Sequence, residues 1–167
     1  MYLISSAGDM CDMAKLKVTT TTQKRSSDGI PLLPEVIPAK TLDAMLKAEA
    51  DVVEPEVVRN AEEMLHGPYW QGLTAEAVTR KKPAYGKGEN GERVRELVLT
   101  FTRLRDDKYH KKSKDKDRRN AAIAFINEYG ARGIPPRPFM SKAVDDKEEE
   151  AKDAGEAVFN EWADKNM

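Results

Sequence analysis

The stretch from Ala121 to Met140 reads A-A-I-A-F-I-N-E-Y-G-A-R-G-I-P-P-R-P-F-M, and it decides the fold that we expect. Its first six residues, Ala121 to Ile126, are all apolar. A short apolar run bounded by turn residues is typical of a buried strand. Gly130 and Gly133 supply the turn residues. The sequence therefore predicts a buried strand over Ala121 to Tyr129, followed by a glycine corner.

A proline connector follows the corner. A proline lacks the backbone N–H and has a fixed φ, so three of them within four residues exclude a helix interior or a central strand. We expect a stiff extended connector, ending in apolar residues and leading into a charged helix that starts at Ser141. The residues that we expect to set the fold here, rather than to bind a partner, are Gly130, Pro135, Pro136, Pro138 and Phe139.

A second helical pattern lies upstream, from Thr41 to Leu65. Apolar residues recur at helical spacing, and Pro55 interrupts the pattern, so we expect the helix to kink or restart there. This predicts a kinked pair of helices. We expect Glu54, Glu56, Glu62 and Glu63 on its outer face. The residues expected to give the helical half of the core are Leu46, Val53, Val57, Ala61, Val144, Val158 and Trp162.

Three further segments have strand patterns. Lys15 to Gln23 alternates and is rich in threonine, which predicts an edge strand. Leu73 to Lys81 is a candidate first strand of the main sheet, Pro83 to Arg93 a glycine-rich turn, and Arg93 to Thr102 alternates well. We expect Arg93 to Thr102 to pair in antiparallel fashion with the strand at Ala121 to Tyr129.

The coarse order of elements predicts an α+β fold. It consists of a mainly antiparallel β-sheet packed by the kinked N-terminal helix pair and the C-terminal helix. We divide the chain into residues 1–40, an N-terminal extension with an edge strand and a proline-rich arm, and residues 41–167, the α+β domain. Within the first part, Met13 is a possible internal start, and an ordinary frayed terminus is the alternative.

Composition narrows the class of protein. The chain has 167 residues, a net charge of −1 and one cysteine, Cys11. This excludes an intramolecular disulfide and gives no overall attraction to nucleic acid or anionic membrane. No apolar run is long enough for a transmembrane helix, and residues 1–13 do not resemble a secretory signal. A soluble cytoplasmic product is the default expectation.

No catalytic constellation stands out. Gly86, Gly88 and Gly91 match the spacing G-x-G-x-x-G, but Pro83 precedes the motif and a strand pattern follows it, which favours a hairpin loop over a dinucleotide site. The two histidines, His66 and His110, have no metal-ligand spacing. We therefore expect no enzyme activity, no cofactor and no metal.

Charge is distributed unevenly along the chain. The segment Arg103 to Arg119 holds nine basic and four acidic residues, a local charge of +5, whereas Asp145 to Lys165 holds nine acidic and three basic residues, a local charge of −6. The basic segment can face DNA, a neighbouring subunit or solvent. Its candidate contact residues are Arg103, Arg105, Lys108, Lys111, Lys112, Lys114, Lys116, Arg118 and Arg119.

The order I-A-F-I-N-E-Y-G followed by I-P-P-R-P-F-M resembles the C-terminal part of a family of minor tail proteins of long-tailed bacteriophages, also called tail-completion, tail-terminator or neck proteins. That family has a Glu-Tyr/Phe-Gly corner, a Pro-Arg-Pro-Phe segment and a C-terminal helix. Pro68, Gly72 and Val78 keep parts of an earlier family segment, in which Gln71 replaces the usual threonine. By pattern the resemblance covers roughly Val57 to Trp162.

The resemblance implies a structural virion protein at the head–tail junction, present in the host cytoplasm during assembly. Family members form rings, commonly of six subunits, that contact the tail tube protein and the head connector, with genomic DNA passing through the lumen. On this reading Lys15 to Gln23 and the basic segment are contact elements. The sequence leaves open whether the chain is a tail terminator, a head-side stopper or an assembly factor. A small nucleic-acid-binding protein that uses the basic segment is the alternative.

Overall fold

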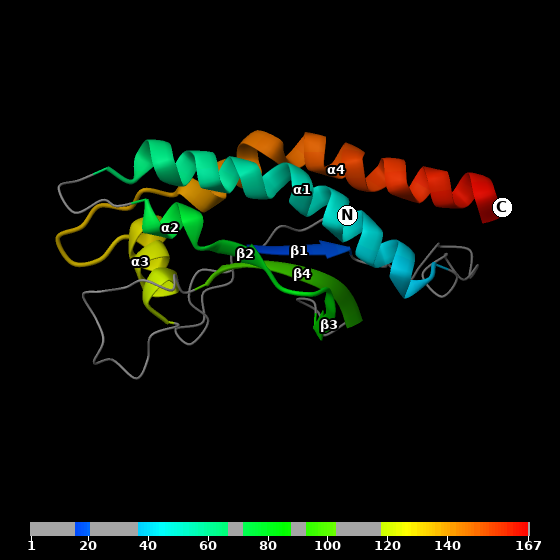
Figure 1. The fold of residues 1–167 in the computed structure, drawn as a ribbon, viewed down its shortest axis with the longest axis horizontal. Helices are drawn as coiled ribbons and strands as arrows, with labels where there is room; N and C mark the ends of the chain where they lie inside the picture. Colours follow the sequence, from blue (N-terminus) through cyan, green and yellow to red (C-terminus); the bar gives the residue numbers. More distant parts are fainter. Residues whose placement is uncertain (1–15, 21–36, 67–71, 88–92, 103–117, 167) are drawn as a thin grey trace, which may run out of the picture.

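The computed structural model describes residues 16–20, 37–66, 72–87, 93–102 and 118–166. In chain order the elements are β1 (Leu16–Thr20), α1 (Ala39–Met64), α2 (Leu73–Glu76), β2 (Val78–Arg80), β3 (Ala84–Lys87), β4 (Arg93–Phe101), α3 (Arg118–Tyr129) and α4 (Phe139–Asn166). Helix α1 lies over one face of a small antiparallel sheet, and α4 runs along α1 on the side away from the sheet (Figure 1). The predicted α+β class is confirmed.

Strand β4 is the centre of the sheet. β1 pairs with one of its edges, with Thr20 opposite Arg95, while β2 and β3 follow one another along the other edge. All three pairings are antiparallel. The predicted strand at Arg93 to Thr102 is therefore confirmed, and so is the predicted edge strand over its described residues, 16–20.

The core lies between β4 and α1. Alternate residues of β4 (Leu97, Leu99 and Phe101) are buried in one apolar cluster with Val53 and Val57 of α1. This follows from the two-residue period of a strand, which turns one set of side chains to the helix. At the end of the sheet the ring of Phe101 packs edge-on against Phe139, with ring centroids 6.2 Å apart, so the start of α4 joins the same core.

Helices α1 and α4 pack along most of their length. Small residues of α4 (Ala143, Ala151 and Gly155) are buried there and allow a close approach of the two helices. Of the core residues expected from the sequence, Leu46, Val53, Val57, Ala61 and Val144 are buried, whereas Val158 and Trp162 are only half-buried.

The strand predicted over Ala121 to Tyr129 is wrong, because the segment is helix α3. A short apolar run cannot separate a buried strand from a helix, and alanine has a high helix propensity. The helix buries Ala121, Ala124 and Glu128, which share one face at helical spacing. β4 consequently pairs with β1, β2 and β3 and not with this segment.

Three smaller predictions also need correction. The segment Leu73 to Lys81 is mostly not a strand, since α2 takes its first half and β2 is only Val78–Arg80. The expected glycine-rich turn contains strand β3. The expected helix pair is one helix, α1, that continues through Pro55. Val53 and Val57, each 1% exposed, lie either side of Pro55, so packing on both sides offsets the hydrogen bond that proline removes.

Candidate interaction surfaces

The sheet edge formed by β2 and β3 is interrupted by a bulge. Arg80 lies opposite Leu99 and Ala84 lies opposite Glu96, so three residues on the edge strand face two on β4. Within the bulge the Lys81 N–H still donates to the Val98 carbonyl, at 2.8 Å. An extra residue of this kind bends an edge and admits a proline, here Pro83. The bulge divides the edge into β2 and β3.

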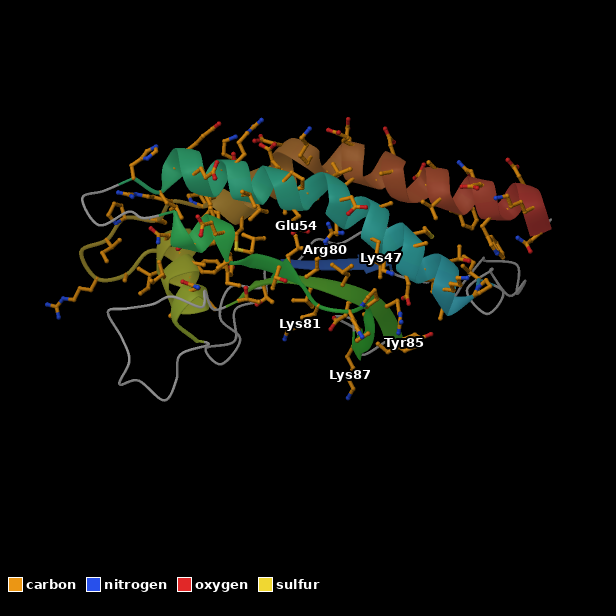
Figure 2. All side chains as sticks on the ribbon, viewed as in Figure 1. Lys47, Glu54, Arg80, Lys81, Tyr85 and Lys87 are labelled. Carbon is orange, nitrogen blue, oxygen red and sulfur yellow. The ribbon has the colours of Figure 1, made fainter. Side chains whose placement is uncertain are left out.

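Two arginines of the sheet are used to attach α1. Arg80 donates a hydrogen bond to the Asp51 carboxylate and forms an ion pair with Glu54, and Figure 2 shows it pointing from the sheet towards α1. Arg95 forms a bidentate pair with Asp43 on the same helix, with N–O distances of 2.6 and 2.9 Å. This hydrogen bonding raises the pKa of the Arg95 guanidinium. Both arginine charges are thus neutralised within the chain.

The lysines of the same edge point away from α1 and have no ion-pair partner among the described residues. Lys81, Lys82 and Lys87 are exposed, and Figure 2 shows Lys81 and Lys87 projecting away from α1. We call these three residues the lysine edge. Among the described residues, no carboxylate lies within ion-pair distance of them. Beside them the ring of Tyr85, 48% exposed, lies 4.5 Å below the Arg95 guanidinium. Within the described part of the chain the lysine edge is therefore an exposed positive surface with no ion-pair partner.

The outer side of α4 is acidic. Several of its carboxylates pair with lysines one turn away, as Asp146 does with Lys142 and Glu161 with Lys165. Five exposed carboxylates of α4, Asp164 among them, have no ion-pair partner in the described part of the chain. Four of these lie close together on the helix, with Asp145, Glu149 and Asp153 successively one turn apart. Together they form what we call the carboxylate row: Asp145, Glu148, Glu149 and Asp153.

The corner between α3 and α4 is held by hydrogen bonds from residues of the sequence motif. The buried Glu128 carboxylate accepts from the Met140 N–H at 2.8 Å and the Ser141 N–H at 2.9 Å, which caps the start of α4. Gly130 has a φ of +79°, and a methyl group there would lie 2.9 Å from the Ile134 carbonyl oxygen. These contacts fix the direction in which α4 leaves the corner.

The other motif residues complete this corner. Arg137 donates its backbone N–H to the Asn127 carbonyl and its guanidinium to the His66 carbonyl. Pro138 accepts the first helical hydrogen bond of α4, and Phe139 is fully buried. Pro135 and Pro136 are exposed. Helix α4 starts at Phe139, two residues before the predicted Ser141.

The seam between α1 and α4 contains buried polar groups that we did not expect from the sequence. Glu49 is 3% exposed, its Oε1 has no hydrogen-bond partner, and it lies against Gly155 of α4. Burial raises the pKa of Glu49 from 4.5 to about 7. Glu56, predicted on the outer face, is 5% exposed and pairs with Arg59. It is buried because α4 covers that side of α1.

Most of the predicted basic contact residues lie outside the described residues. For Arg118 and Arg119 the structure gives only the backbone, as the first two residues of α3. Of the G-x-G-x-x-G motif, Gly86 lies in β3, which forms an antiparallel hairpin with β4 and not a β–α–β unit. His66 follows the end of α1 and is exposed.

The described residues contain no cluster of histidine, cysteine or carboxylate side chains that could hold a metal ion. No helix among them is long and apolar enough to cross a membrane. No family model, no curated protein and no solved structure matches the chain.

Proposed function

We propose that this chain is a structural virion protein of the head–tail junction of a long-tailed bacteriophage. It forms a ring of identical subunits that completes the tail and joins it to the head connector, with DNA passing non-specifically through the lumen. Its partners are further copies of itself, the tail tube protein and the connector. Its mechanism is assembly and involves no chemistry on a substrate.

The observation that carries this proposal is the corner between α3 and α4. The residues on which the family resemblance rests are the ones that build it: Glu128 caps α4, Gly130 has the positive φ, and Arg137 and Phe139 tie the connector to α1 and the sheet. A motif whose members each have a role in one compact unit is better evidence of relationship than the same letters scattered over a surface.

Two further features suit a ring subunit. The strand β1 has β4 as its partner on one side, and among the described residues its other side carries no strand, which suits the addition of a strand from a neighbouring chain. The lysine edge and the carboxylate row give the subunit two surfaces of opposite charge. Unlike surfaces on one subunit generate head-to-tail contacts, which close into a ring when the rotation permits.

The test is to measure the mass of the full chain by light scattering after size exclusion, alone and with tail tubes of the same phage, with electron microscopy of the mixture. We expect ring-sized particles, or a smaller species that becomes a ring on the tube end. A strict monomer that ignores tail tubes at every concentration would overturn the proposal.

A nucleic-acid-binding protein is the second candidate, and the uncompensated lysine edge is the observation that favours it. Each lysine placed on a phosphate adds affinity that falls as salt rises. The net charge of −1 and the single exposed aromatic beside the lysines weigh against it. Tight duplex binding by a monomer, measured by fluorescence anisotropy over a range of salt, would favour this candidate over the ring.

A further inference from the structure

We propose that the lysine edge of one subunit binds the carboxylate row on α4 of a second copy of this chain. The inference rests on the proposed ring, because it names the two surfaces that meet when neighbouring subunits associate. The occupant of the lysine edge is thus a helix face of the same protein, and no other macromolecule is required.

The first argument is the separation of the two surfaces within one chain. Helix α1 lies between the sheet and α4, so the carboxylate row is on one side of the molecule and the lysine edge follows the margin of the layer on the other side of α1 (Figure 1). They cannot neutralise one another inside a single subunit. A contact between them is therefore heterologous, using two different patches.

The second argument is that the arginines of the sheet face α1 and are paired there, whereas the lysines of its edge face away from α1. Arg80 pairs with Asp51 and Glu54 of α1, and Arg95 pairs with Asp43. These three carboxylates of α1 are therefore already neutralised by the arginines. The lysine edge is left with positive charge that nothing in the described chain compensates. An acidic surface on a second copy of the chain can supply the compensating charge, and the carboxylate row is one that every copy carries.

The third argument is geometric. Asp145, Glu149 and Asp153 are four residues apart, so they form a line rising about 6 Å at each step and about 12 Å in all. Lys81 lies beside Val98 of β4 and Lys87 opposite Arg93, so the two lysines are about 17 Å apart along the edge. Lysine side chains are long and flexible, and so they can converge on a shorter line of carboxylates. Lysines on a strand edge also oppose the addition of another strand, which favours a side-chain contact with a helix.

The experiment uses charge reversal in the full-length chain. One variant carries Lys81→Glu, Lys82→Glu and Lys87→Glu, a second carries Glu148→Lys, Glu149→Lys and Asp153→Lys, and a third combines all six. Self-association is measured by sedimentation velocity in low salt. We expect each triple variant to raise the dissociation constant by about tenfold or more, and the combined variant to return to within about threefold of wild type.

Two controls separate this contact from a general effect of charge. The variant Glu62→Lys, Glu63→Lys, Glu76→Lys changes the net charge as much as the helix variant does, at exposed sites outside both surfaces, and should associate as wild type does. An equimolar mixture of the two triple variants should associate although neither does alone, because each then offers the charge that the other lacks. All variants should have the same circular dichroism spectrum.

The outcomes distinguish this proposal from the proposed function. If wild type and all variants form rings on tail tubes equally well, the ring stands and the assigned interface is wrong. If charge reversal is rescued as expected but no variant recognises tail tubes, the interface stands and the virion role is wrong. A wild type that self-associates neither alone nor on tail tubes would overturn the interface. Duplex DNA binding that is lost with the lysines and not restored in the combined variant would also overturn it.

Discussion

The buried carboxyl of Glu49 should make the stability of this protein depend on pH in a direction opposite to that of most carboxylates. Its pKa in the folded chain is about 7 against an ordinary value of 4.5, because the side chain is removed from water in the seam between α1 and α4. The folded state therefore holds this proton more tightly than the unfolded state does. The stabilisation is fully present below pH 4.5 and is lost as the pH rises through about 7.

The magnitude follows from the interval between the two pKa values. At about 1.4 kcal/mol for each pKa unit, the ionised carboxylate costs roughly 3 kcal/mol relative to the protonated acid. Between pH 5 and pH 8 this one group should lower the free energy of unfolding by about 2.5 kcal/mol. The group is 3% exposed, so solvent does not reduce this figure greatly.

The perturbation is Glu49→Gln, which keeps the size of the side chain and removes the titration. The free energy of unfolding would be measured from urea curves, followed by circular dichroism, at intervals between pH 5 and pH 8. We expect the variant and wild type to be close at pH 5, and the variant to gain about 2.5 kcal/mol on wild type by pH 8. All other titrating groups cancel in the difference between the two proteins.

The matched control is Glu62→Gln, an exposed carboxyl on the same helix, whose difference from wild type should stay flat with pH. If the Glu49→Gln difference is also flat, the carboxyl is solvated or paired in solution, and the burial assigned to it is wrong. If the variant is less stable at every pH, the amide itself is badly accommodated against Gly155, and the slope of the difference with pH still reports whether Glu49 titrates near 7.

Three further predictions concern the corner between α3 and α4, each read out as the free energy of unfolding from urea curves. Gly130→Ala should cost about 2 kcal/mol or more, because the added methyl group clashes with the backbone at a residue of positive φ. Gly133→Ala should cost about 1 kcal/mol, because Gly133 has a φ of +80° but open space around it. Equal costs for the two variants would mean that the clash at Gly130 is relieved. Glu128→Ala should cost about 2 kcal/mol through loss of the cap on α4, and Glu128→Gln less, since one acceptor remains; an unchanged stability would show that the cap contributes nothing. Phe139→Ala should cost about 4 kcal/mol for a fully buried ring, and a cost below 1 kcal/mol would contradict its place in the core.

The features of the fold that could be predicted from the sequence are those whose hydrophobic pattern repeats over many residues. The alternation over Arg93 to Thr102 covers the nine residues of strand β4, and the apolar stripe of α1 extends over about seven turns. Patterns of this length distinguish a strand from a helix. The run Ala121 to Ile126 is too short to have a period, and its alanines fit a helix as well as a strand. In the structure the run lies in helix α3, whose Glu128 caps the start of α4.

Two features of the candidate surfaces could not be predicted in this way. Glu49 and Glu56 look exposed in sequence because they are charged, and only the packing of α4 against α1 buries them. A usable indication was nevertheless present, since Glu49 lies on the apolar stripe four residues after Met45 and four before Val53. The lysine edge is equally hidden, because Lys81 and Lys82 lie in the bulge after β2 whereas Lys87 lies five residues further on, in β3.

The two edges of the sheet differ in a way that bears on how subunits can join. The β2–β3 edge is short in both segments, bulged at Lys81 to Pro83 and lined by lysines, and each of these features blocks the pairing of another strand. β1 has five residues in regular register with β4 and no bulge over that length. Main-chain pairing between subunits is therefore expected at β1, and contact through side-chain charge at β2–β3. A ring built this way would weaken with salt at one joint and resist salt at the other, because screening acts on charges and not on strand pairing.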